Sequence, residues 1–343
     1  MLRRVFCRIA LIVVVICGLL GLSSVLLAQG RSEQALERVI EVQERHTERL
    51  MAIEGVVGTA VTLNPGGQLS VAVLLERPGV GGIPQQLEGV PVHPVVTGEI
   101  SALQPSEASA GALAVPSARF PRPVPIGVST GHPLITAGTI GCRVKDALGN
   151  VYALSNNHVY ADENAGPIGV NVLQPGPYDG GVNPGDAIGT LSAYEPIVFS
   201  TSASNVIDAA IARSSTSLLG NSTPSDGYGT PKATTATARI NAAVKKYGRT
   251  TGLTKGKIWA VNATVNVGYA SGVARFVNQI IITPGAFSAG GDSGSLAVLD
   301  GGKRNGANDR QPVGLLFAGS SSVTIACPID LVLSRFGVTI DGQ

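Results

Sequence analysis

A serine framed by glycines lies near the end of the chain, in the stretch Phe287–Ser295 (FSAGGDSGS). On a tight turn of this kind the hydroxyl can project outward while neighbouring backbone N–H groups point to one spot. Acyl transfer needs both features, because the attacking oxygen and the donors for the developing oxyanion must converge on one carbonyl. Ser293 is therefore the candidate nucleophile, and a base that activates it is expected elsewhere in the chain.

His158 is the candidate base, since a hydroxyl is a poor nucleophile at neutral pH unless a base lies beside it. It follows a short apolar strand within Ser155–Val159 (SNNHV). At a strand end its imidazole can face a cleft. The alternative is a turn histidine whose hydrogen bonds are satisfied locally.

One carboxylate interrupts an otherwise apolar run, Asn205–Ala212 (NVIDAAIA). A buried carboxylate is costly unless a partner compensates it, which makes Asp208 a good candidate for orienting an imidazole. A capping or turn aspartate is the alternative. A second acid, Asp179, lies in the Pro- and Gly-rich stretch Leu173–Gly181, which predicts an exposed rigid turn or a lip contacting substrate. Asp208 is therefore preferred.

The three candidates occur in the order His158, Asp208 and Ser293, with spacings of 50 and 85 residues (158 to 208, then 208 to 293). This is the order of the triad in chymotrypsin-type enzymes. Gly291–Gly294 (GDSG) matches the family's nucleophile turn. Lys246–Ile258 (KYGRTTGLTKGKI) is similar to the opening of the second barrel in the streptogrisin and alpha-lytic types. The chain therefore resembles the trypsin-like (chymotrypsin-fold) serine peptidases of the secreted bacterial type.

The resemblance covers about residues 134–340 and implies an all-β fold. Two six-stranded antiparallel β-barrels, near 134–235 and 240–340, would hold the active site between them. Composition agrees, because 44 glycines and only 14% charged residues are typical of a turn-rich β protein. Short apolar runs divided by Gly, Asn, Asp and Pro fill this part of the chain, and a short helix is expected at 329–336.

The resemblance also implies a role for each candidate in hydrolysing peptide bonds through an acyl-enzyme. Ser293 would attack the carbonyl, His158 would take its proton and return it to the leaving amine, and Asp208 would fix the imidazole. The backbone N–H groups of Gly291 and Ser293 would form the oxyanion hole. Phe287 is the predicted substrate-binding residue, since it stands six positions before the nucleophile, where trypsin has an aspartate. It argues against a Lys/Arg preference and favours small or apolar substrate side chains.

Several classes of partner are not expected. A net charge of +2 without a basic stripe gives no reason to expect nucleic acid. The four histidines are scattered and no CxxC or HExxH occurs, so we expect no metal and no other cofactor. Cys142 and Cys327, the two cysteines of the exported part, either pair or remain as buried thiols. Val159 stands where the family often has a cysteine after the catalytic histidine, so the family disulfide there is missing.

The rest of the chain predicts export and a separate N-terminal unit. A basic start and an apolar run from Ile9 to about Ala28 indicate a signal peptide or a retained membrane anchor. Either would place the protein outside the cytoplasm, secreted or periplasmic, with membrane contact only through an uncleaved segment. The expected parts are 1–29 for that segment, 31–100 for a small α/β unit, 101–133 for a Ser/Ala/Pro-rich linker and 134–343 for the peptidase domain.

The α/β unit is expected to contain a helix at 32–54 and strands at 56–63, 69–75 and 90–96. We interpret it as a pro-region, with Arg119 and Arg122 as cleavage points, or else as a permanent binding domain. For the whole chain, the leading hypothesis is an exported serine endopeptidase. The alternatives are a peptidase that acts once on its own linker, and a non-catalytic binding protein that keeps the fold.

Overall fold

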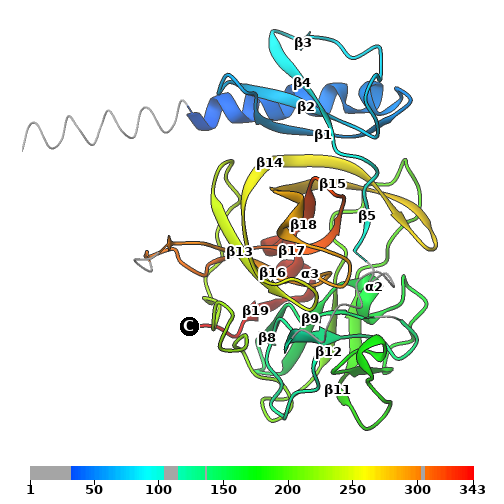
Figure 1. The fold of residues 1–343 in the computed structure, drawn as a ribbon, viewed down its shortest axis with the longest axis vertical. Coiled ribbons are helices and arrows are strands. Elements are labelled where there is room, and N and C mark those ends of the chain that lie inside the picture. Colours follow the sequence, from blue (N-terminus) through cyan, green and yellow to red (C-terminus); the bar gives the residue numbers. More distant parts are fainter. Residues whose placement is uncertain (1–31, 104–114, 136, 303–305) are drawn as a thin grey trace, which may run out of the picture.

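Two β-sheets dominate the computed structural model, which describes residues 32–103, 115–135, 137–302 and 306–343 (Figure 1). The predicted export segment, 1–29, lies outside these residues. Helices are few and short apart from the first, so the prediction of an all-β architecture is confirmed. Within the described ranges, no helix is both long enough and apolar enough to cross a membrane.

One of the two sheets is called the second sheet here, and six of its strands pair in a closed ring. Their order is β13-β16-β17-β18-β15-β14 and back to β13. Ser293 lies on the turn that enters this ring, between η4 (Gly285–Phe287) and β16. The strands are β13 (Ala243–Gly248), β14 (Gly252–Tyr269), β15 (Gly272–Thr283), β16 (Leu296–Leu299), β17 (Pro312–Gly319) and β18 (Thr324–Pro328).

The first sheet has six strands in the order β10-β11-β12-β9-β8-β19. Its last strand comes from the end of the chain and follows helix α3 (Ile329–Phe336), which has the predicted bounds. Among the described strands the two outer ones are not paired with each other. The strands are β8 (Cys142–Asp146), β9 (Val151–Ser155), β10 (Asn171–Leu173), β11 (Ala187–Tyr194), β12 (Ala210–Arg213) and β19 (Val338–Ile340). A separate small pair joins β6 (Ser129–Thr130) to β7 (Gly138–Thr139).

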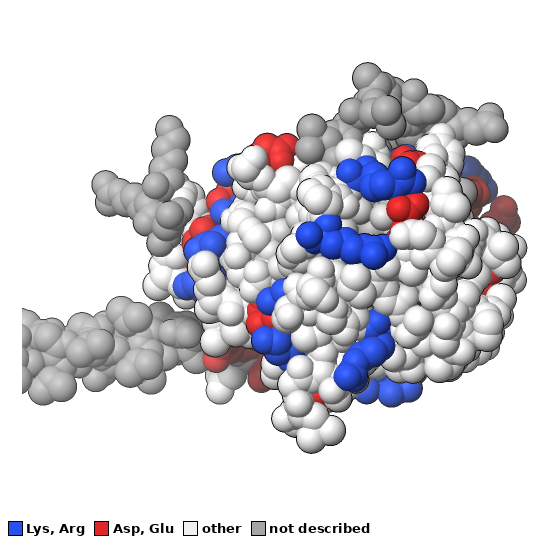
Figure 2. All heavy atoms as spheres, turned by 90° about the horizontal axis from the view of Figure 1, so that it is seen from below, with Lys and Arg blue, Asp and Glu red and all other residues white. Residues whose placement is uncertain are grey.

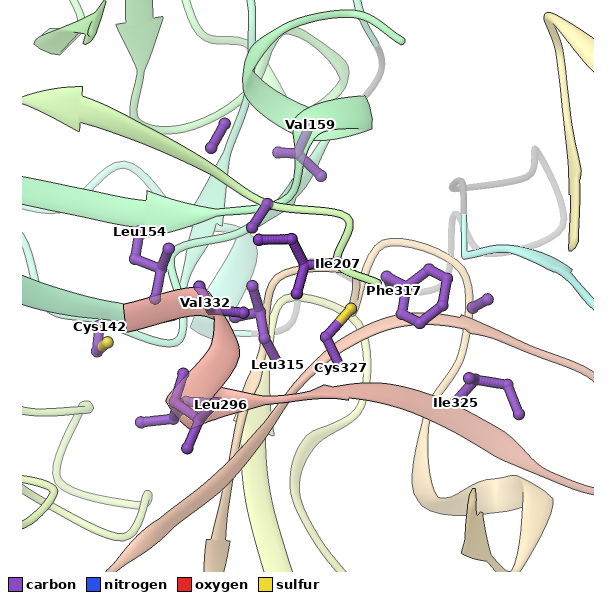
Figure 3. Close-up of a cluster of buried hydrophobic side chains, with 14 of the residues drawn as sticks. Cys142, Leu154, Val159, Ile207, Leu296, Leu315, Phe317, Ile325, Cys327 and Val332 are labelled. Carbon is purple, nitrogen blue, oxygen red and sulfur yellow. The ribbon is translucent and has the colours of Figure 1, made fainter. Parts of the chain in front are cut away.

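One apolar core joins the two sheets (Figure 3). Leu154 from the first sheet and Leu315 from the second belong to the same buried cluster. Cys142 and Cys327 are also in it, and both are free thiols, so the structure favours two buried thiols over a disulfide. Burial raises the pKa of both thiols well above the usual range, which keeps them protonated and apolar in character.

The N-terminal unit extends the second sheet. Its strands are β1 (Val56–Leu63), β2 (Leu69–Leu75), β3 (Gln86–Leu87) and β4 (Val90–Val96), of which β1, β2 and β4 have the predicted bounds. β1 pairs antiparallel with β14, for example Gly58 with Val265 and Thr62 with Ala260. The helix over residues 32–51 packs its apolar face on this sheet (Figure 1). It ends three residues earlier than predicted, because residues 52–55 turn toward β1.

The predicted linker is more ordered than its composition indicated. Residues 104–114 lie outside the described residues, but Val124, Ile126 and Val128 are buried in the common core, so residues 124–130 belong to the folded body. The burial of this Pro-rich stretch comes from its alternating apolar residues, which pack in the common core. The side chain of Arg119, one of the two predicted cleavage points, binds Asp186, with Nε 2.8 Å from Oδ1.

The face of the molecule over the first sheet carries few charges (Figure 2). Lys and Arg side chains stand apart from one another there, separated by uncharged surface. This follows from the low charged content of 14%, and no continuous basic stripe crosses that face.

Candidate active site

His158 lies in the short helix α2 (Asn157–Tyr160), directly after β9. The sequence predicted that His158 lies at the end of a strand. In the structure it belongs to a single helical turn that follows the strand. This turn forms because Tyr160 N–H and Ala161 N–H donate to the carbonyls of Asn156 and Asn157. The histidine side chain is only 2% exposed, so its ring is almost wholly removed from water.

Asp208 is fully buried and reaches His158 directly, with 2.6 Å between its Oδ2 and the imidazole Nδ1. Its Oδ1 accepts from the backbone N–H groups of Asn157, at 2.7 Å, and of His158, at 3.3 Å. The sequence placed this carboxylate inside an apolar run, and the strand of that run, β12, begins only at Ala210. Asp208 therefore lies on the extended segment just before the strand, where its side chain can turn toward the N-terminus of α2.

Tyr269 is a third partner of this pair, and sequence reasoning did not identify it. Its hydroxyl donates to Asp208 Oδ2 at 2.9 Å. Its ring meets the His158 ring edge-on, with the centroids 5.9 Å apart. Tyr269 ends β14 at the tip of a long hairpin, 61 residues from Asp208. No local sequence pattern indicates such a distant contact.

The turn that carries Ser293 requires its two flanking glycines. Gly291 and Gly294 have φ angles of +95° and +90°, in the left-handed region that favours glycine. A Cβ on Gly291 would lie 2.5 Å from Thr250 Oγ1, and one on Gly294 would lie 2.3 Å from the carbonyl oxygen of Thr139. The GDSG pattern is therefore a steric requirement of this turn.

A buried ion pair anchors the same turn from behind. Asp292, the residue before Ser293, has its Oδ2 3.1 Å from Lys246 Nζ, and neither side chain is exposed. Asp292 also accepts from the backbone N–H of Thr250 at 2.8 Å and from Thr251 Oγ1 at 2.7 Å. Burial lowers the pKa of the Lys246 ammonium, and the Asp292 carboxylate opposes that shift.

Asp179 does not orient the imidazole, but the prediction that its side chain is exposed is wrong. Its carboxylate is 3% exposed and binds the guanidinium of Arg249, whose Nε lies 2.9 Å from Oδ2. Ser129 also donates to this carboxylate. The burial is possible because Arg249, from the turn between β13 and β14, supplies the compensating charge. The stretch 173–181 therefore links the two sheets.

The segment just after the N-terminal unit enters the site. β5 (Ser101–Ala102) lies between β14 and β17, antiparallel to β17, with Ala102 opposite Ala318. The next residue, Leu103, donates its N–H to the carbonyl of Phe317 at 3.1 Å. Its own carbonyl oxygen accepts from the N–H of Gly291 at 2.7 Å. Composition predicted this stretch to be a linker, and the structure makes it a strand.

Among the described residues, no hydrogen bond joins Ser293 to His158. Ser293 Oγ lies 3.2 Å from the carbonyl oxygen of Leu103 and 3.3 Å from that of Phe317, and its one proton can serve only one of them. Within the described part of the chain, His158 Nε2 has no hydrogen-bond partner although it is buried. His158 therefore has a buried nitrogen without a described hydrogen-bond partner, and the Ser293 hydroxyl donates to a backbone carbonyl.

The other two predicted roles are placed as follows. Of the two oxyanion donors, Gly291 N–H points at the Leu103 oxygen, whereas Ser293 N–H donates to no described residue. Phe287 is fully buried in an apolar cluster of the second sheet, with Val244 and Ile258 among its neighbours. Its role in substrate binding stays a prediction.

The fold is similar to that of bacterial chymotrypsin-like serine proteases. Thermobifida fusca protease A is 19% identical, with 64% of this chain and 100% of that chain covered and a TM-score of 0.44. Nocardiopsis protease is 19% identical, with 63% and 99% covered and a TM-score of 0.43. A glutamic acid-specific serine protease, described as using a histidine triad in substrate binding, is 23% identical, with 63% and 100% covered and a TM-score of 0.44.

Sequence comparison adds one partial match. A family model described as the Nal1 C-terminal domain matches residues 232–326, which include Ser293 but not His158 or Asp208. No curated protein matches the chain.

Proposed function

We propose that this protein is an exported serine endopeptidase that hydrolyses peptide bonds through an acyl-enzyme. The observation that carries the proposal is the buried pair of His158 and Asp208, in which the imidazole Nε2 has no hydrogen-bond partner among the described residues. A buried imidazole held by a carboxylate and lacking a partner is poised to accept a proton.

Each of the three residues would have its own role in the reaction. Ser293 Oγ attacks the substrate carbonyl carbon while its proton passes to His158 Nε2, and Asp208 stabilises the imidazolium through Nδ1–H. The developing oxyanion accepts from the N–H groups of Gly291 and Ser293. His158 then gives the proton to the leaving amine, and water releases the acyl group by the same steps in reverse order.

The N-terminal unit is the proposed pro-region, and residues 1–29 the proposed export segment. Pairing of β1 with β14, together with entry of β5 into the site, supports a unit that keeps the enzyme closed until it is removed. A permanent binding domain is the alternative for this unit. For the whole chain, a non-catalytic binding protein is the alternative, and it predicts a serine with no special reactivity.

The test is labelling of the full chain with a small uncharged fluorophosphonate. We expect the parent chain to be labelled and Ser293→Ala to be unlabelled. Ser288→Ala is the matched control, because Ser288 lies five positions earlier and bonds Thr324 instead. Leu103→Arg is labelled in parallel, since a charged residue would disfavour the strand in the site. If all four folded chains fail to react, the protein is not a serine hydrolase.

A further inference from the structure

Residues 101–103 add a strand to β17 in one defined register. Ser101 lies opposite Gly319, Ala102 lies opposite Ala318, and Leu103 N–H donates to the carbonyl of Phe317 at 3.1 Å. Extended peptides commonly bind in this way, with main-chain bonds to an exposed strand providing affinity and side-chain pockets providing specificity. The segment therefore occupies β17 as a bound peptide would.

The register brings one carbonyl to the reactive groups. Leu103 O accepts from Gly291 N–H at 2.7 Å, within the 2.7–3.1 Å that is typical of oxyanion donors. Ser293 Oγ is 3.2 Å from the same oxygen. Among residues 101–103, only Leu103 has a carbonyl oxygen that contacts both Gly291 N–H, the proposed oxyanion donor, and Ser293 Oγ, the proposed nucleophile.

We propose that Leu103 is the acyl residue of a peptide bond that the protein cleaves in its own chain, between Leu103 and Gln104. The proposal rests on the proposed function and names its substrate class, which is peptides with leucine or a similar aliphatic residue before the cleaved bond. Gln104 itself lies outside the described residues, so the structure describes the acyl side of the bond.

The step balances without any further reactant except water. Ser293 Oγ bonds to the Leu103 carbonyl carbon as its proton moves to His158 Nε2. The Leu103 C–N bond then breaks, and His158 returns the proton to the amine of Gln104. Water hydrolyses the ester, which leaves a carboxylate on Leu103 and restores Ser293.

The surroundings of Leu103 favour an aliphatic side chain over a charged one. Its Cδ2 would lie 3.3 Å from a Cβ added to Gly319, so the side chain packs on the small end of β17. The two buried carboxylates of the site are already engaged, Asp208 by His158 and Asp292 by Lys246. A cationic side chain at position 103 would therefore find no unpaired carboxylate among these two with which to form an ion pair.

The two arginines considered as cleavage points are held elsewhere. Arg119 binds Asp186 and the carbonyl of Gly180, and Arg122 donates to the carbonyl of Gly185 at 3.0 Å. Both therefore lie against the first sheet, away from the groups that contact Leu103.

The experiment compares five full-length chains by N-terminal sequencing and intact mass over time. They are the parent, Ser293→Ala, Leu103→Met, Leu103→Arg and Ser288→Ala. We expect the parent, Leu103→Met and Ser288→Ala to yield a fragment that begins at Gln104, while Ser293→Ala stays whole. Leu103→Arg also has an unbranched stem but is longer than methionine and adds a charge, and we expect its cleavage at this bond to be at least about tenfold slower.

Each other outcome has a definite meaning. Ser293-dependent cleavage at a different bond, such as after Arg119, would overturn the inference and leave the peptidase standing. The inference would also be overturned if the chain stayed uncleaved while Ser293 still reacted with the fluorophosphonate. Residues 101–103 would then act only as an inhibitor of the site. Equal rates for Leu103→Met and Leu103→Arg would overturn the side-chain preference. Only a chain that is neither cleaved nor labelled would remove the proposed function as well.

Discussion

Asp208 shows how a single buried carboxylate can be held in one orientation. Its two oxygens accept from two backbone N–H groups, from the His158 imidazole and from the Tyr269 hydroxyl. Burying an ionised carboxylate is tolerated only when its lone pairs are used in this way. Because two donors are backbone groups, the carboxylate keeps its place even when one side-chain donor is removed.

Tyr269 is therefore expected to be a positioning residue. In Tyr269→Phe, loss of a hydrogen bond to a charged group should lower kcat for a peptide substrate by about tenfold or more, with KM little changed. Steady-state kinetics measure this split, and the melting temperature reports stability. Tyr194→Phe is the control, because that hydroxyl bonds the carbonyl of Asn164 instead. A change in KM alone would contradict the role.

The two cysteines give a second prediction at this scale. Because burial raises the pKa of the Cys142 and Cys327 thiols, both should remain protonated and inert at pH 8. We expect no alkylation by iodoacetamide in the folded protein and alkylation of both after unfolding in guanidinium chloride, as counted by mass spectrometry. Alkylation of either thiol in the folded protein would contradict the burial.

At the scale of elements, the hairpin of β13 and β14 holds the turn that carries Ser293 in place. The Lys246–Asp292 pair is buried, and removing one partner of such a pair costs about 3–5 kcal/mol. Lys246→Met should lower the free energy of unfolding by about this amount in urea denaturation. Lys255→Met is the control on the same hairpin, because its pair with Asp300 is 63% exposed on the lysine side and should contribute about 0–1 kcal/mol. Equal losses would contradict the anchoring role.

The sequence predicted those elements and site residues that have local signals. Strands 56–63, 69–75 and 90–96 and helix 329–336 follow from the spacing of apolar residues, and the structure gives the same bounds. His158 could be selected because it follows an apolar strand, Asp208 because it interrupts an apolar run, and Ser293 because glycines flank it. Whether they act catalytically stays a prediction, while the contact between the first two is now described.

The parts that could not be predicted are contacts between distant segments. Tyr269 meets Asp208 across 61 residues, Leu103 meets Ser293 across 190, and Arg249 meets Asp179 across 70. None of these residues differs locally from an ordinary strand or turn residue. Only the packing of two sheets and an added unit brings them together, so local composition misjudged both the linker and the burial of Asp179.

For the whole molecule, the N-terminal unit and the second sheet form one continuous β-structure. β1 covers the edge of β14 that would otherwise be open, and edges of this kind are normally protected. The pairing of β1 with β14 requires the two backbones to approach closely at Gly58, where a Cβ would lie 2.7 Å from the carbonyl oxygen of Thr264.

Gly58→Val should therefore separate β1 from β14. We expect faster hydrogen–deuterium exchange in peptides covering residues 258–266, measured by mass spectrometry on the full chain. Gly81→Val is the control, because nothing lies within 4 Å of a Cβ at that position. Unchanged exchange in Gly58→Val would mean that the contact tolerates the larger side chain.

The position of β19 has a consequence for synthesis of the protein. The other five strands of the first sheet are complete once residue 213 has been made, but β19 starts only at residue 338. At the usual pace of about 5–20 residues per second, a ribosome needs roughly 6–25 s to cover that interval. Until then β8 is paired with β9 but lacks its second neighbour, so the sheet that holds His158 and Asp208 reaches its final form only after residues 338–340 have been made.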